Sequence, residues 1–312
     1  MIAPFSFDLP LAYLRGSPAT IVERLGERSY HRPLVIDGQP SLLSVSQPAD
    51  GADTLLVSLQ STQLPNNPEN LVRPIVERMF GARTDVRPLL DSIARKDEFG
   101  SGLLTRFRGL RPVLFPDLFE TIVWAIIGQQ INVSFAGKCK RAFVERFGDS
   151  FTLDGESWML FPSPERVLEI TEPELAEIQF SRQKSRYILN LAHEVVEGRL
   201  DLNALYAMPA ETALERLQQL KGVGRWTAEY VLMRGVGQPD VIPAGDGGLR
   251  RIIGQQYGMG RLATEHEVRA IAEAWTGWRS YFAFYLWFTL QEEGHARRTA
   301  RLQQGLANGS PL

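Results

Sequence analysis

The chain has 312 residues, an apolar content of 44% and one cysteine, Cys139. This length fits two or three domains, and the apolar content is enough for more than one hydrophobic core. A single cysteine excludes an internal disulfide framework and a four-cysteine iron–sulfur cluster, and it fits a reducing compartment. The formal net charge of −2 does not indicate nucleic acid binding, although a local basic patch could still bind it.

The first residues of the chain lack the basic stretch and apolar run of a secretory signal. The longest aromatic and apolar run, residues 281–290, is too short to span a bilayer. The 4 histidines are scattered without the spacing of metal ligands, and no Walker or Rossmann glycine motif occurs. We therefore expect a cytoplasmic protein that contacts no membrane and binds no metal or organic cofactor.

Residues 1–85 have the pattern of a small α+β domain. Asp37 and Gly38 lie between two β-like runs, which is a strong signal for a hairpin turn. Two helices are expected where a polar residue precedes proline, at Ser17 and at Asn67. The predicted elements are strands at 30–36, 41–46 and 54–59, a short helix from Ser17, and a second helix at 67–80.

After residue 85 the strand signals fade, and helical periodicity dominates to the end of the chain. Residues 119–132 are apolar on nearly all sides of a helix, so this segment should be a buried central helix. Gly and Pro separate the helical segments. Helices are predicted at residues 86–98, 117–130, 134–147, 164–178, 182–197, 210–220, 226–236, 247–257, 264–275 and 279–304.

Residues 211–250 read as a helix, a Gly-x-Gly turn and a second helix, followed by a lone carboxylate at Asp246. Gly222 and Gly224 can adopt positive φ angles and let another molecule approach the main chain. The N–H groups of the turn and of the next helical turn lack intrahelical partners, so they could bind a phosphate without reading sequence. The alternative is a simple corner between two helices.

Residues 220–228, Leu-Lys-Gly-Val-Gly-Arg-Trp-Thr-Ala, together with Tyr230 and Asp246, resemble the helix-hairpin-helix DNA glycosylase superfamily. The form is closest to its 3-methyladenine DNA glycosylase II branch, and the resemblance covers most of the chain. It implies an α+β protein with an all-α glycosylase core of two helical lobes. The implied domains are a TATA-binding-protein-like antiparallel sheet domain at 1–85, a lobe at 113–230 with the start of the hairpin unit, and a lobe of 86–112 and 231–312 with the catalytic aspartate.

The resemblance implies a monofunctional DNA glycosylase that flips an alkylated base, such as 3-methyladenine or 7-methylguanine, out of double-stranded DNA. It would hydrolyse the N-glycosidic bond and leave an abasic site for base excision repair. Asp246 is the matching catalytic position, where a fixed carboxylate stabilises the oxocarbenium-like sugar. Asp246 could also simply cap the helix that follows it, and both roles are compatible.

DNA contacts are implied along the hairpin and at the end of the predicted central helix. The family places there a residue that fills the gap left by the flipped base, a leucine in the bacterial enzyme. Here the position is Gln130 or its neighbour Ile131, and the alternative for this segment is a helix C-cap. The implied DNA-binding residues are Lys221, Gly222, Val223, Gly224, Arg225, Thr227, Gln130 and Ile131.

The implied base pocket is aromatic, because electron-rich ring faces attract cationic alkylated purines and stack on a flipped base. Trp226 and Tyr230 share one helix face, Trp287 matches a tryptophan of the family's cleft, and Tyr13 matches an N-terminal aromatic. Each of them could instead belong to the core. Gly247 replaces a larger aromatic of the bacterial relative, which implies a more open pocket.

Trp226 also stands where superfamily members that nick the DNA backbone carry a Schiff-base lysine, so the resemblance implies no lyase activity. Two alternatives remain at this point: a non-catalytic, damage-sensing DNA-binding protein on the same scaffold, and a bifunctional glycosylase and lyase for oxidised bases. We expect a monomer, with a possible monovalent cation at the hairpin carbonyls when DNA is bound.

Overall fold

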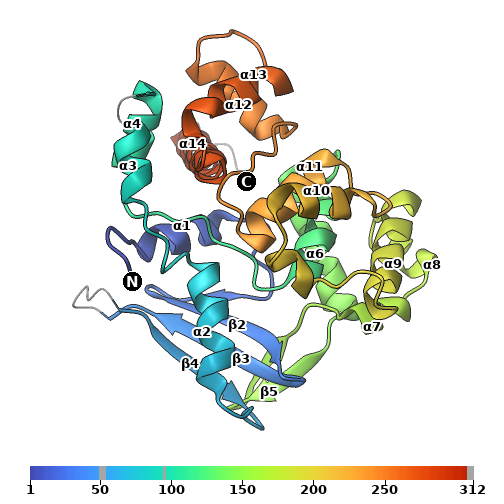
Figure 1. The fold of residues 1–312 in the computed structure, drawn as a ribbon. Helices are drawn as coiled ribbons and strands as arrows, with labels where there is room; N and C mark the ends of the chain where they lie inside the picture. Colours follow the sequence, from blue (N-terminus) through green and yellow to red (C-terminus); the bar gives the residue numbers. More distant parts are fainter. Residues whose placement is uncertain (49–53, 94–95, 308–312) are drawn as a thin grey trace.

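The computed structural model describes residues 1–48, 54–93 and 96–307. An antiparallel sheet with strand order β1-β2-β3-β4 and two helices form the N-terminal part, and the rest of the chain is mainly helical (Figure 1). The α+β fold predicted from the sequence is therefore confirmed. The N-terminal elements are α1 (Asp8–Gly16), β1 (Arg24–Leu25), β2 (Ser29–Ile36), β3 (Gln39–Ser46), β4 (Leu56–Ser61) and α2 (Pro68–Met79).

The predicted hairpin is confirmed, because β2 and β3 pair up to Ile36 and Gln39 around a two-residue turn. Asp37 and Gly38 have φ angles of 50° and 75°, as this kind of tight turn requires. The helix predicted to begin at Ser17 is wrong. Ser17 instead follows the last residue of α1, in an extended conformation with ψ of 120°. Proline disfavours a helical conformation in the residue before it, so Ser17 and Pro18 end a helix here.

The helical part contains the elements predicted from periodicity, with four differences, one of which is that the helix predicted at 226–236 is α-helical only to Val231 and forms a π-helical turn at Leu232–Val236. A helix over Glu98–Arg106 was not predicted; Gly100 lies inside it, where a Cβ atom would come within 2.5 Å of Trp275. The segment 164–178 is two helices, because Thr171 forms a capping box that starts the second one. The α-helices of this part are α3 (Arg87–Ile93), α4 (Glu98–Arg106), α5 (Leu118–Gly128), α6 (Val133–Phe147), α7 (Pro164–Leu168), α8 (Glu172–Glu177), α9 (Arg182–Val196), α10 (Ala210–Gln218), α11 (Arg225–Val231), α12 (Gly247–Gln256), α13 (Glu265–Ala272) and α14 (Arg279–Ala307).

The fourth difference is a small hairpin that the sequence pattern did not reveal. Strands β5 (Ser150–Leu153) and β6 (Glu156–Met159) pair antiparallel across Asp154 and Gly155. These two residues have φ angles of 51° and 81°, as do their counterparts in the first hairpin within a few degrees. The Asp-Gly signal was therefore present at 154–155. It was obscured because its flanking strands are only four residues each.

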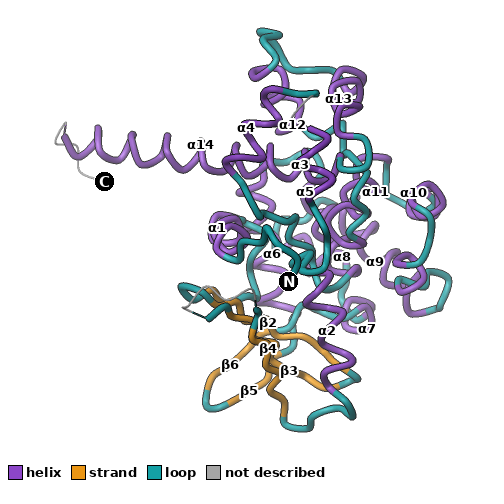
Figure 2. The backbone as a smooth tube through the Cα atoms, turned by 60° about the vertical axis from the view of Figure 1, so that its left-hand side comes forward, coloured by secondary structure: helices purple, strands orange, loops and turns teal. Residues whose placement is uncertain are grey.

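Buried apolar side chains form two clusters. One joins the N-terminal sheet with α1, α2, α3, α4 and α12 to α14, and the other lies among α5, α6 and α9 to α11. The sheet therefore shares a core with the C-terminal helices. Helix α5 is buried from Leu118 to Ile127, as its apolar sequence predicts. The end of α14 extends away from the body of the molecule (Figure 2). Among the described residues, no helix combines the length and apolar character needed to cross a membrane.

A buried cluster of four charged side chains connects the sheet to α5 and α6. Arg32 on β2 pairs with Glu23 at 2.6 Å and with Glu120 of α5. Lys140 of α6 donates to Glu120 at 2.7 Å and to the carbonyl of Ala19 at 2.6 Å. Burial alone would raise the pKa of Glu120, but the charges of Arg32 and Lys140 outweigh it and hold that pKa below its usual range.

Candidate active site

A cleft of about 1780 Å³ lies between the helices of the two apolar clusters. It is lined by residues of α1, the end of α5, the turn between α10 and α11, the loop before α12, and α14. This volume exceeds the roughly 300–1,000 Å³ typical of small-molecule pockets. The cleft is therefore large enough for a polymeric ligand that places one unit inside.

The predicted tight turn between α10 and α11 is present, but only the first of its two glycines has a positive φ angle, since Gly224 has a φ of −84°. Gly222 has a φ angle of 87°, and a Cβ atom there would lie 2.2 Å from the ring of Tyr187. Glycine is thus required at this position both by conformation and by space. Gly224 is exposed, and a Cβ atom there would meet nothing within 4 Å. Lys221 and Arg225 are also exposed, so the turn presents its main chain and two cations to solvent.

Asp246 lies in this cleft, together with the glycine turn. It is the N-cap residue of α12, and its Oδ1 accepts hydrogen bonds from the Leu249 N–H at 2.9 Å and the Trp287 indole at 3.0 Å. Its Oδ2 accepts no hydrogen bond from the described residues. Asp246 is only partly buried. The helix cap is therefore real, and it fixes one carboxylate oxygen while the other remains available.

Three aromatic side chains, Trp226, Tyr230 and Trp287, form a row in the cleft. The ring of Tyr230 lies 5.9 Å from that of Trp226 and 5.7 Å from that of Trp287. Trp226 and Trp287 are partly exposed, whereas Tyr230 is buried and its hydroxyl accepts from the Trp124 indole at 2.9 Å. Burial raises the pKa of Tyr230 above its ordinary value. The two tryptophans thus present ring surface to the cleft, and Tyr230 forms its inner wall.

Tyr13 also lines the cleft, but it is mostly a core residue. Only 8% of it is exposed, and its ring packs against Phe284 at 4.5 Å. Its hydroxyl accepts from the guanidinium of Arg234 at 2.8 Å. Arg234 is itself buried and donates to the Val113 carbonyl at 2.9 Å. Tyr13 therefore positions Arg234 at the edge of the cleft.

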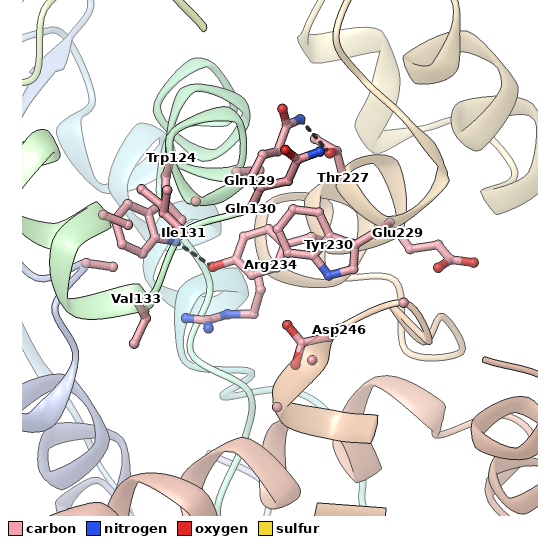
Figure 3. A pocket seen from close by; sticks show the side chains of 18 of the residues that line it. Trp124, Gln129, Gln130, Ile131, Val133, Thr227, Glu229, Tyr230, Arg234 and Asp246 are labelled. Carbon is pink, nitrogen blue, oxygen red and sulfur yellow. Dashed lines mark hydrogen bonds between the residues drawn. The ribbon is translucent and has the colours of Figure 1, made fainter. Parts of the chain in front are cut away.

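The segment after α5 is tied to the glycine turn by Gln129, a residue that the sequence motifs did not single out. The amide of Gln129 donates to the Gly222 carbonyl at 2.8 Å and to the Thr227 hydroxyl at 3.0 Å (Figure 3). Gln130 follows with a φ angle of 56° and an exposed side chain, whereas Ile131 is partly buried. Thr227 and Val223 are buried as whole residues, so they belong to the wall of the cleft and offer little surface to a ligand.

The cleft carries a surplus of positive charge, although the chain as a whole is acidic. Arg251 is exposed there and has no ion pair within the described ranges. Gly247 has open space around it, so the region beside Asp246 is not covered. No cluster of three metal-ligating side chains occurs in the part of the chain that the structure describes. The charged residues of the cleft are Lys184, Arg225, Arg234, Arg251 and Arg269 against Glu229, Asp246 and Glu265.

Comparison with known proteins identifies the family to which the chain belongs. Residues 123–277 match the model of the HhH-GPD superfamily base excision DNA repair protein. The chain is 38% identical to DNA-3-methyladenine glycosylase of Bacillus subtilis over 222 residues, which cover 71% of this chain and 73% of the relative. It is 27% identical to DNA-3-methyladenine glycosylase 2 of Escherichia coli over 291 residues, 92% of this chain and 94% of the relative.

A solved structure agrees with these relatives over nearly the whole length. The 3-methyladenine DNA glycosylase of Archaeoglobus fulgidus superposes with a TM-score of 0.79 at 30% identity, covering 90% of this chain and 94% of that one. The agreement includes the N-terminal sheet as well as the helical part, because residues 123–277 alone make up only about half of the chain. The chain belongs to the helix-hairpin-helix superfamily of base excision DNA repair proteins.

Proposed function

We propose that this chain is a monofunctional DNA glycosylase that acts as a monomer on alkylated purines, such as 3-methyladenine and 7-methylguanine, in double-stranded DNA. The damaged nucleotide is flipped into the cleft, its N-glycosidic bond is hydrolysed, and an abasic site remains. The relatives named above as 3-methyladenine glycosylases support this activity. The observation that carries it is the Asp246 carboxylate, held by two donors on one oxygen and free on the other.

The chemistry follows from that geometry. As the bond between the sugar C1′ and the base nitrogen lengthens, its electron pair moves to the base and positive charge develops on the sugar. An N-alkylated purine already carries a positive charge, so it leaves as a neutral molecule and needs no general acid. The free Oδ2 of Asp246 stabilises the sugar cation and orients the water that attacks C1′. Trp287 and the Leu249 N–H keep that carboxylate in place.

The remainder of the cleft supports the same substrate. The exposed Gly224 and the cations Lys221 and Arg225 suit the phosphates of a DNA strand. The partly exposed rings of Trp226 and Trp287 suit stacking on a flipped, cationic base. The surplus of cations around the cleft reconciles DNA binding with the net charge of −2.

A lyase activity is not favoured. Trp226 occupies the position at which a Schiff-base lysine is expected in bifunctional relatives. Lys184 is the one lysine that lines the cleft among the described residues, and its ammonium donates to the Ile127 carbonyl at 2.6 Å. Neither residue offers a free amine beside Asp246. Borohydride treatment of the protein with damaged DNA should therefore trap no covalent adduct.

The test is Asp246→Asn in single-turnover release of bases from methylated duplex DNA. Asparagine keeps an oxygen for the Leu249 and Trp287 hydrogen bonds but loses the negative charge. We expect the rate constant to fall by about 10³-fold, which corresponds to roughly 4 kcal/mol of transition-state stabilisation, with little change in DNA affinity. Asp240→Asn is the control, because Asp240 lies on the same loop but pairs with Arg279.

Base release by Asp246→Asn at the wild-type rate would remove Asp246 from the mechanism. A wild-type protein that binds methylated DNA and releases no base would instead identify a non-catalytic damage sensor.

A further inference from the structure

A buried carboxylate joins two arginines at the edge of the cleft. Glu229 on α11 is 3% exposed, and its Oε1 accepts from the Arg225 Nε at 2.9 Å and from an Arg269 Nη2 at 2.8 Å. Arg225 lies on the same helix, whereas Arg269 comes from α13. The buried residues of α11 and α13 belong to different apolar clusters. The two guanidinium groups therefore meet at one oxygen from opposite sides of the cleft.

Both arginines keep unused hydrogen-bonding capacity. A guanidinium carries five N–H donors, and each of these two uses one nitrogen on Glu229. Their side chains are 58% and 32% exposed and line the cleft. The single charge of Glu229 neutralises only one of the two positive charges. One net positive charge and several donors therefore face whatever occupies the cleft.

The position of the pair relative to Asp246 is set by α13. Glu265, one turn before Arg269, lies against the catalytic loop, since its Oε1 is 3.2 Å from where a Cβ atom of Gly245 would be. The Cβ atom of Trp226 lies 3.6 Å from the same point, so Glu265 and Trp226 both border Gly245. Arg225 directly precedes Trp226 in the chain. The two arginines thus come from the two segments that border Gly245, next to Asp246, and Arg225 adjoins Trp226 of the aromatic row.

We propose that Arg225 and Arg269 together bind one phosphate of the damaged strand, next to the flipped nucleotide, and that buried Glu229 positions both. The proposal rests on the proposed function, in which DNA occupies the cleft. Phosphate is the ligand because it is an anion with several acceptor oxygens, which two planar guanidinium groups can grip in a fixed geometry. Arg225 and Arg269 are binding residues, and Glu229 is a positioning residue that touches no DNA.

The first test measures affinity for a duplex that contains a tetrahydrofuran abasic-site analogue, over a series of KCl concentrations. A lost phosphate contact lowers the slope of log affinity against log salt by about 1. Arg269→Ala and Arg225→Ala should each show this change and lose on the order of tenfold in affinity. Arg261→Ala is the matched control, because Arg261 is 57% exposed and paired with Glu267, but does not line the cleft.

The second test isolates Glu229 by a double-mutant cycle with Glu229→Gln. If Glu229 positions the arginines, Arg269→Ala should lose clearly less affinity in the Glu229→Gln background than in the wild type. Additive losses would show that Glu229 does not act through Arg269 and would overturn its positioning role. Thermal unfolding of every variant confirms that the folded protein is being compared.

If Arg269→Ala leaves the salt slope unchanged and lowers the unfolding temperature, the phosphate site is refuted. Arg269 would then only stabilise the packing of α13 against α11. The outcome is separable from that of the proposed function. A wild-type protein that releases no base, combined with the reduced slope of Arg269→Ala, would refute the enzyme and support the phosphate site.

Discussion

Two clusters of charged side chains in this protein have nearly the same composition, but one is buried and the other borders solvent. At the junction of the sheet with α5 and α6, Arg32 and Lys140 are fully buried around Glu120. At the cleft, Arg225 and Arg269 are partly exposed around the buried Glu229. In both clusters a buried glutamate holds two cations. They differ in whether the cations have solvent-exposed donors for a ligand.

At the junction the charged groups are buried, and most of their hydrogen bonds are made within the cluster. Lys140 also donates to a main-chain carbonyl, and Arg32 also donates to a second glutamate. Removing any partner there would leave a charge in a region without water. At the cleft the arginines remain in contact with solvent and can exchange water for a ligand at little cost. Accessibility of the cations, and not the presence of ion pairs, therefore separates a stabilising cluster from a binding one.

The largest expected effect on stability comes from Glu120→Ala. It would leave Arg32 and Lys140 buried without their shared counter-charge, so we expect the free energy of unfolding to fall by about 3–5 kcal/mol. Urea unfolding measures it. Glu169→Ala removes an exposed pair with Arg166 and should change stability by about 0.5 kcal/mol or less. Equal effects of the two variants would contradict the comparison between buried and exposed charges.

The same cluster should make the protein sensitive to acid. The pKa of Glu120 is lowered in the folded state, so its stabilising contribution is fully present above the pKa of an unfolded glutamate. It is lost as the pH falls from that value through the lower pKa of the folded state. Unfolding free energies measured between neutral and acidic pH should fall steeply in this window. In Glu120→Gln that fall should be shallower, and an unchanged slope would exclude Glu120 as its source.

A smaller effect is expected at Asp246, the carboxylate that we propose to be catalytic. Trp287→Phe keeps an aromatic ring in the cleft but removes the indole donor to Asp246 Oδ1. A hydrogen bond to a charged group is worth about 1.5–3 kcal/mol, so the single-turnover rate constant should fall on the order of tenfold or more. Trp278→Phe, outside the cleft, should leave that rate constant unchanged. If Trp287→Phe is as active as wild type, the indole does not fix the carboxylate.

The smallest effect is expected at the residue that we propose to fill the gap in the DNA stack. Gln130 is exposed, whereas Ile131 packs against the second apolar cluster. Gln130→Ala should therefore lower the affinity for lesion-containing duplex a few-fold, since stabilising a flipped base involves only a few kcal/mol in total. Ile131→Ala should mainly lower thermal stability. The reverse pattern, measured by titration and thermal unfolding, would assign the gap-filling role to Ile131.

Local patterns in the sequence were sufficient for most elements of the fold and for the outline of the cleft. The helical periods, the Asp37–Gly38 turn and the buried α5 depend on neighbours a few residues apart, so the chain itself specifies them. The error at Ser17 arose because a polar residue before proline can begin a helix or follow one. Whether the polar residue begins or follows a helix depends on whether the preceding residues are helical, as they are before Ser17. Asp246 was recognisable from the glycine turn and the family pattern that precede it.

Only the tertiary structure decided how these residues are used. Glu229 meets Arg269 across 40 residues, and Glu120 meets Arg32 across 88, so no local spacing relates either pair. Gln129 reaches the hairpin across 93 residues. Arginine, lysine and glutamate side chains form a buried ion-pair cluster at one place and line an open, positively charged cleft at another. Water access decides between these outcomes, and it is set only when distant helices pack together.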